Sequence, residues 1–226
     1  MKKRIILMAL IVLVVLTAVI MTSCSDDSVE IEADNNNEVS NELEGESEEN
    51  LEHTITPEAP PEYITIRGEQ FSTDLTELNL GSVGGDLPIT GLSNVDIEPL
   101  RYMMNLEMLV LVGQDAISSI EFLRYMANLE RLHLVNNAIS DITPLAELTN
   151  LRTLDLQSNQ ISDISPLANL INLDILQLPN NQISDVSPLM GLTNLKSLLL
   201  TDNPLNSEQI EELRTALPNI VIFADD

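Results

Sequence analysis

The sequence has no tryptophan, only 3% aromatic residues and a single cysteine among its 226 residues. A core built from it must therefore be aliphatic, and one cysteine excludes both a disulfide framework and a multi-cysteine metal site. Basic residues are also scarce, with 10 Lys and Arg against 36 Asp and Glu. Nucleic acid and anionic lipid surfaces are bound through a basic footprint, so this charge balance argues against both as main partners.

The N-terminal end has the pattern of an export signal. A basic triplet at residues 2–4 precedes an uncharged apolar run at 5–21, and small residues follow. The stretch MTSC at 21–24 resembles the lipobox of bacterial lipoproteins, although methionine stands where that family usually has leucine. The resemblance implies a signal peptide at 1–23 and a lipidated Cys24. The alternative is an uncleaved membrane helix. Both interpretations place the rest of the chain outside the cytoplasm, because the basic end stays inside.

Residues 24–62 are interpreted as an acidic linker. Residues 25–62 contain 14 Asp and Glu and neither Lys nor Arg, and their isolated apolar residues form no face. Low hydrophobicity with charge of one sign cannot offset the entropy lost on ordering, so the sequence predicts a disordered tether. The alternative is an acidic tail that binds cations weakly.

An internal repeat organises the remaining chain. Residues 151–172 and 173–194 align without a gap, and five units can be aligned by their first leucine: Leu106, Leu129, Leu151, Leu173 and Leu195. A fixed period in this range is the signature of a solenoid. The shared core L-x-x-L-x-L-x-x-N-x-I-x-x-I-x-x-L resembles bacterial leucine-rich repeat proteins in their 22-residue, internalin-like form. The resemblance implies an α/β solenoid, a short horseshoe with a parallel concave β-sheet, 3₁₀-like convex turns and a C-terminal helix cap.

Residues 151–172 show how one unit would fold. Residues 153–157 alternate between polar and apolar side chains, which predicts a short strand with its leucines facing inward. Asn159 follows, and its amide can satisfy backbone groups where the strand ends. Its equivalents would stack as a ladder: Asn137, Asn181 and Asn203. Ser165 before Pro166 predicts a helical turn with a hydroxyl cap.

One unit cannot bury its apolar side chains alone, so the array requires neighbours and a cap at each end. Residues 63–105 are assigned to an N-terminal cap and an irregular first repeat, and residues 106–205 to the repeats. Residues 206–226 are assigned to a C-terminal cap, in which Ser207 is expected to cap a helix.

The glycine-rich stretch 81–91 lacks the lysine of a phosphate-binding loop and is expected to project as an irregular loop. Contact between this loop and a partner is the alternative.

The expected functional surface is the concave face of the sheet, where outward side chains flank the inward leucines. Here an apolar patch is predicted at Met108, Val110, Val112 and Val135, with Arg131 and His133 at its edge, and exposed apolar clusters commonly mark interaction sites. Folding of the N-terminal cap or of the 81–91 loop over the patch is the alternative. The residues expected to contact a partner are Met108, Val110, Val112, Arg131, His133, Val135, Thr153, Asp155, Gln157, Ile175, Gln177 and Leu199.

Two sets of side chains suggest other chemistry. His133 and Asp155 fall side by side on adjacent strands and could act as base and orienter of a hydrolase, but no Ser or Cys nucleophile is placed with them. A second ladder consists of Asp141, Asp163 and Asp185. A bound cation and exposed turn polarity are its two interpretations.

The sequence thus predicts a bacterial cell-surface protein that is not an enzyme. It would be anchored to the membrane outside the cytoplasm and would bind a protein or glycan through its concave face, with adhesion as one form of that role. No cofactor and no metal are expected. The alternative is a cell-envelope scaffold that assembles the cell's own proteins.

Overall fold

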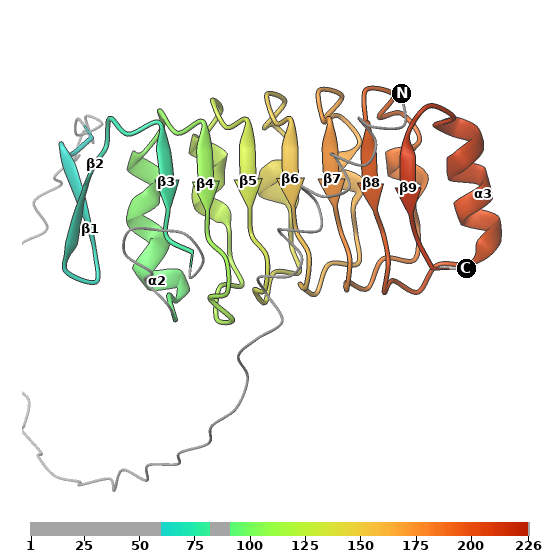
Figure 1. The fold of residues 1–226 in the computed structure, drawn as a ribbon. Helices are drawn as coiled ribbons and strands as arrows, with labels where there is room; N and C mark the ends of the chain where they lie inside the picture. Colours follow the sequence, from blue (N-terminus) through green and yellow to red (C-terminus); the bar gives the residue numbers. More distant parts are fainter. Residues whose placement is uncertain (1–59, 82–90, 226) are drawn as a thin grey trace, which may run out of the picture. The chain divides into compact units, whose positions relative to one another are not determined.

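The computed structural model describes residues 60–81 and 91–225, which hold two sheets (Figure 1). The smaller sheet is an antiparallel pair, β1 (Tyr63–Ile66) and β2 (Glu69–Ser72). The larger sheet has seven parallel strands in chain order. They are β3 (Glu77–Asn79), β4 (Met108–Val110), β5 (Arg131–His133), β6 (Thr153–Asp155), β7 (Ile175–Gln177), β8 (Ser197–Leu199) and β9 (Val221–Phe223).

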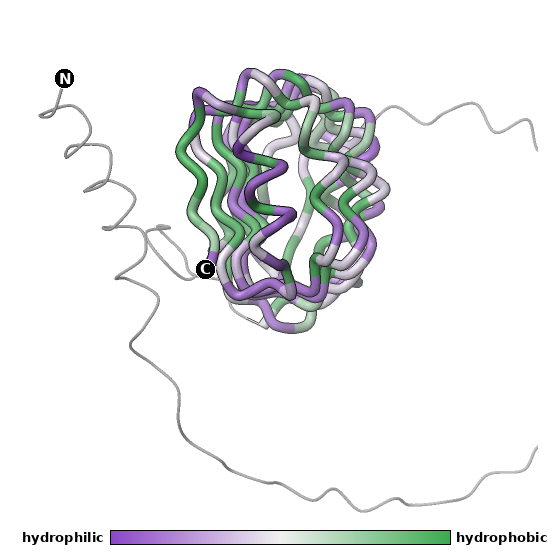
Figure 2. The backbone as a smooth tube through the Cα atoms, turned by 90° about the vertical axis from the view of Figure 1, so that its right-hand side faces the viewer, coloured by the Kyte–Doolittle hydropathy of each residue, from purple (hydrophilic) through white to green (hydrophobic). Residues whose placement is uncertain are grey.

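Short helical segments carry the chain back from each strand to the next. In the first return, α2 (Asn94–Ile97) continues into the 3₁₀ segment η1 (Glu98–Tyr102). The later returns contain η2 (Glu121–Tyr125), η3 (Thr143–Leu145), η4 (Ser165–Leu167) and η5 (Ser187–Leu189). The ten-residue helix α3 (Ser207–Ala216) follows β8. In the end view of Figure 2 the strands form one wall of a tube and the return segments the other. The predicted fold class, a leucine-rich repeat solenoid with a C-terminal helix, is confirmed.

The core is a continuous column of aliphatic side chains. In residues 151–172 it contains Leu151, Leu154, Leu156, Ile161, Ile164, Leu167 and Leu170, none of which is more than 1% exposed. The strand register places Leu132, Leu154 and Leu176 side by side on β5, β6 and β7. Each layer of leucines is therefore covered by the layers on either side, which makes burial a property of the stack rather than of one unit.

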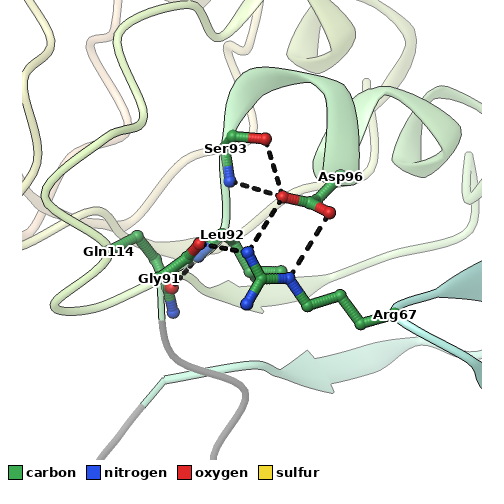
Figure 3. A network of polar contacts seen from close by, with 6 residues as sticks. All are labelled: Arg67, Gly91, Leu92, Ser93, Asp96 and Gln114. Carbon is green, nitrogen blue, oxygen red and sulfur yellow. Dashed lines mark hydrogen bonds and ion pairs between the residues drawn. The ribbon is translucent and has the colours of Figure 1, made fainter. Parts of the chain in front are cut away.

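The hairpin β1–β2 covers the N-terminal end of this column. Ile64 and Ile66 on β1 point inward and are buried. Figure 3 shows how the hairpin turn is attached to the first repeat. Arg67 donates to both carboxylate oxygens of Asp96 on α2, at 3.3 and 3.4 Å, and to the carbonyl oxygen of Gly91.

At the opposite end, Ile210 and Leu213 of α3 are buried, and Leu213 belongs to the continuous core. The expectation that Ser207 caps this helix is wrong, because the cap is Asn206. The Asn206 side chain accepts from the backbone N–H of Gln209 at 2.9 Å, and the Gln209 side chain accepts from the backbone N–H of Asn206 at 3.0 Å. This reciprocal pair satisfies two N–H groups that a helix start leaves unpaired.

The predicted hydroxyl caps of the 3₁₀ turns are also wrong. Thr143, Ser165 and Ser187 are the first residues inside η3, η4 and η5, and no side chain of the preceding residue forms a cap bond. An aspartate two residues before each of these positions caps the turn instead. Its carboxylate accepts from the first backbone N–H of the turn at 2.8 Å. A carboxylate is a better acceptor than a hydroxyl for this orphan donor, because the hydrogen bond is charge-assisted.

Several predictions concern residues outside those described. They are the signal peptide at 1–23, the lipidated Cys24, the linker up to residue 59 and most of the 81–91 loop. Among residues 60–81 and 91–225, no helix has the length and apolar character needed to span a membrane.

Candidate functional site

The candidate site is the sheet face, which we define as the side of β3–β9 that points away from the leucine column. Neighbouring parallel strands lie about 4.8 Å apart, so equivalent residues form rows across this face. Most of the predicted contact residues are at least partly accessible in these rows: Met108, Val110, Val112, Arg131, His133, Thr153, Gln157, Ile175 and Gln177. The register confirms that His133 lies beside Asp155, and it places Met108 beside Arg131.

Three predicted contact residues are buried instead: Val135 at 7%, Asp155 at 3% and Leu199 at 8% exposure. For these three the expectation of a side chain presented to solvent is wrong. Asp155 lies between His133 and Gln177, and Leu199 lies between Gln177 and Phe223. At a strand spacing of about 4.8 Å, larger neighbours on both sides cover a side chain of this size.

The apolar patch therefore consists of Met108, Val110 and Val112, all partly accessible and all outside the leucine column. Gly81 lies beside it at the end of β3. A Cβ atom at Gly81 would be only 3.2 Å from Val110 Cγ1 and 3.3 Å from Val112 Cβ. The absence of a side chain at Gly81 thus allows both valines to pack closely against the neighbouring backbone.

An ion pair crosses the patch. Arg131 Nη2 on β5 lies 2.7 Å from Glu77 Oε1 on β3, although β4 separates these two strands. Met108 occupies the same row between them. Both charged side chains are about half exposed. Arg131 therefore already forms an ion pair within the protein.

His133 and Asp155 lie together as predicted, but without the geometry of a catalytic pair. The distance from His133 Nδ1 to Asp155 Oδ2 is 3.8 Å, which is beyond hydrogen-bond length. The other carboxylate oxygen accepts from the Gln157 amide at 3.1 Å. Among residues 60–81 and 91–225, no hydroxyl or thiol side chain is hydrogen-bonded to His133. In these residues, His133 and Asp155 therefore have no nucleophile that they could activate.

The predicted asparagine ladder is present behind the sheet. The Asn159 amide group donates to the carbonyl oxygens of Leu134, Leu156 and Gln157, and its oxygen accepts from the Ile139 amide. Asn181 and Asn203 repeat this pattern. These side chains satisfy buried backbone groups, so their role is structural.

Gln114 extends the ladder into the first repeat, which the sequence prediction missed. It occupies the position of Asn137 one unit earlier. Its side chain donates to the Leu80 carbonyl oxygen, and its oxygen accepts from the Leu92 backbone N–H at 2.8 Å (Figure 3). Ile117 follows Gln114 by three residues, whereas Ile139 follows Asn137 by two, so this unit is one residue longer. Asn137 Oδ1 is consequently a buried acceptor without a partner in the described part of the chain.

A second series of asparagines also went unpredicted. Asn128, Asn150, Asn172 and Asn194 each donate to a backbone carbonyl of the preceding unit, at 2.8 to 3.1 Å. The available signal was an asparagine directly before the first leucine of each unit. This series joins neighbouring units at the start of the strands.

The last strand, β9, adds two large apolar side chains to the sheet face. Val221 is 53% exposed and Phe223 is 49% exposed. They continue the rows of Ser197 and Leu199. The strand is apolar throughout, so its sequence did not show which side chains point outward, and the pairing of β9 with β8 places Val221 and Phe223 on this face.

The aspartate ladder has a structural explanation. Hydrogen bonds from the side chain and backbone of Thr143 hold the pKa of Asp141 below its ordinary value, and bonds from Ser165 and Ser187 do the same for Asp163 and Asp185. Each carboxylate is therefore engaged in closing its own turn. In the described segments, no group of three or more His, Cys, Asp or Glu side chains is arranged to hold a metal ion.

Comparisons with known proteins agree with this architecture. Models described as leucine-rich repeats match residues 127–169, as two copies, and residues 149–205. A search of curated proteins finds no match.

Two solved bacterial structures are similar to this chain. An internalin (inlF) from Listeria monocytogenes is 27% identical over 70% of this chain and 51% of its own length, with a TM-score of 0.56. A leucine-rich repeat protein of Leptospira interrogans is 26% identical over 66% of this chain and 37% of its own length, with a TM-score of 0.58. The chain thus spans about half of the internalin and less than half of the Leptospira protein.

A plant structure shares the fold alone. It is the leucine-rich repeat ectodomain of the membrane receptor kinase GASSHO1/SCHENGEN3 from Arabidopsis thaliana, in complex with CASPARIAN STRIP INTEGRITY FACTOR 2. It is 23% identical over 68% of this chain and 18% of its own length, with a TM-score of 0.54.

Proposed function

We propose that this chain is a membrane-anchored, extracytoplasmic protein that binds another protein through its sheet face. The observation that carries the proposal is the apolar patch of Met108, Val110 and Val112. These side chains lie outside the leucine column and remain partly accessible, so burial in the core does not account for them. The complex named for the plant ectodomain is consistent with this use of the fold, and the similarity to an internalin fits a bacterial surface protein.

Anchoring is proposed from the N-terminal sequence alone. The basic triplet, the apolar run and Cys24 fit a lipoprotein signal, and the acidic linker would separate the repeat domain from the membrane. Adhesion is one form that the binding role would take. A scaffold for the cell's own envelope proteins is the other, and glycan is the alternative ligand class.

Site-specific cross-linking tests the binding role. A photoreactive phenylalanine derivative at Val110 of the full chain is expected to capture a discrete partner in intact cells, and Met108→Glu in the same chain should abolish capture. The same derivative at Val95 is the control, because Val95 is 80% exposed and lies on α2, away from the sheet face. Equal capture from both positions, or none from Val110, would count against the proposal. Foreign partners would indicate adhesion and endogenous partners a scaffold.

A further inference from the structure

The carboxylates beside the apolar patch point to the chemistry of its partner. Glu107 and Glu130 directly precede β4 and β5, so they border the patch at the start of two adjacent strands. Both side chains are exposed. Backbone bonds from Glu130 and Arg131 to the Glu107 carbonyl hold the two positions side by side, at 2.8 and 2.9 Å.

No cation of the described segments forms an ion pair with Glu107 or Glu130. Arg152 follows Glu130 in the same row but pairs with Asp174 at 3.7 Å, and Arg131 in the next row is engaged by Glu77 across Met108. The other lysine and arginine side chains of residues 60–81 and 91–225 form ion pairs elsewhere: Arg67 with Asp96, Arg101 with Glu98, Arg124 with Glu121, Lys196 with Asp174, and Arg214 with Glu211. Glu107 and Glu130 take part in none of them. The border of the patch therefore carries two unmatched negative charges.

We infer that the sheet face at β4 and β5 takes a protein segment in which apolar side chains are flanked by Lys or Arg. This inference rests on the proposed function and specifies its partner. Apolar side chains of the segment would cover Met108, Val110 and Val112, and its cations would pair with Glu107 and Glu130. Complementary charges at the rim of an interface fix register and reject partners of the wrong sign. An acidic segment would meet two carboxylates with every nearby arginine already paired.

A second copy of this chain fits the patch less well. A two-fold interface brings the same residues of both copies together. It would place four unmatched carboxylates around one apolar contact, and like charges placed opposite each other across an interface are strongly unfavourable.

A random linear peptide library provides the test, with the full chain purified in detergent and immobilised. The native chain is expected to enrich peptides that combine apolar residues with Lys or Arg. Met108→Glu with Val110→Glu should abolish that enrichment. Glu107→Lys with Glu130→Lys should instead remove Lys and Arg from the enriched set. The charge-matched control is Glu147→Lys with Glu212→Lys, which alters two exposed carboxylates away from the sheet face and should leave the selection unchanged.

Affinity for one enriched peptide gives a second readout. Glu107→Gln with Glu130→Gln is expected to weaken binding on the order of three- to ten-fold at low salt, since exposed ion pairs contribute modestly. The difference should vanish at high salt, where such pairs are screened. Circular dichroism of each variant checks that the repeat fold is retained.

The outcomes separate this inference from the proposed function. If selection depends on Met108 and Val110 but not on Glu107 and Glu130, or if the control pair has the same effect, the patch binds a partner of other chemistry. No enrichment, or peptides that still bind the Met108→Glu and Val110→Glu variant, overturns both. A dimer of the native chain that this variant dissociates would identify a second copy as the occupant and would overturn the inference.

Discussion

Single asparagines join the units at the back of the sheet, and their contributions differ in a way that the hydrogen bonds define. Asn159 uses both its amide group and its oxygen, whereas Asn137 uses only its amide group because its oxygen is a buried acceptor without a described partner. The cause is the extra residue after Gln114, which shifts the Ile117 amide away from Asn137. A change of one residue in repeat length thus costs one buried hydrogen bond.

Asn159→Ala is expected to lower the free energy of unfolding by roughly 2–4 kcal/mol, because it leaves several buried backbone groups unpaired. Asn137→Ala should cost about 1 kcal/mol less, since its oxygen contributes no bond. Urea unfolding of the two variants measures the difference. Equal losses would show that Asn137 Oδ1 has a partner in solution.

At the scale of elements, the hairpin β1–β2 is fastened to α2 through Asp96. Ser93 donates to this carboxylate from its hydroxyl and its amide at 2.7 and 2.8 Å, and Arg67 reaches it from the hairpin turn (Figure 3). The hydrogen bonds from Ser93, together with Arg67, lower the pKa of Asp96 from 3.8 to about 2. The ionised carboxylate is therefore stabilised by folding.

This shift predicts how stability depends on pH. A carboxyl group with a lowered folded-state pKa stabilises the protein above its unfolded pKa, and that contribution is lost as the pH falls through about 4 towards about 2. Asp96→Asn should remove on the order of 1–2 kcal/mol at neutral pH and little at about pH 2. Urea midpoints across this range measure it, with Asp74→Asn as a control at an exposed carboxylate without an ion pair to a described cation. A loss for Asp96→Asn that is the same at both pH values would contradict the assignment.

At the scale of the whole molecule, the acidic excess and the N-terminal pattern have opposite effects on membrane attachment. An excess of negative charge keeps a protein soluble and weakens binding to anionic membrane surfaces. Attachment to a membrane would then depend on the N-terminal segment, either through a lipid on Cys24, the single thiol in the sequence, or as an uncleaved membrane helix. A single acyl chain gives only marginal, reversible binding, so stable attachment requires more than one chain.

Cys24→Ala is accordingly expected to abolish uptake of labelled fatty acid. Metabolic labelling followed by immunoprecipitation of the full chain measures this. Cys24→Ser is a matched substitution that keeps the size of the side chain and should behave in the same way. Label that remains on the Cys24→Ala chain would rule out the lipid anchor.

The fold was largely predictable because a repeat is a local pattern. Leucine and isoleucine recur at fixed positions, such as Leu154 and Leu176, and each recurrence independently indicates the same strand and the same inward face. The strands, the helical returns and the main asparagine ladder follow from that regularity. Departures were harder to foresee where one side chain replaces another in the same role, as Gln114 does for asparagine and Asp163 for a hydroxyl cap.

The sequence by itself determined that the chain is a repeat solenoid with outward-facing rows, because the period fixes which side chains point into the core. Only the tertiary structure decided which members of those rows reach solvent. Asp155 and Leu199 are covered by neighbours on adjacent strands, and β9 brings Val221 and Phe223 onto the same face. The tertiary structure also decided that Glu77 pairs with Arg131 across Met108, while Glu107 and Glu130 form no ion pair with a described cation. These properties depend on contacts between residues far apart in the chain, which a repeat pattern does not encode.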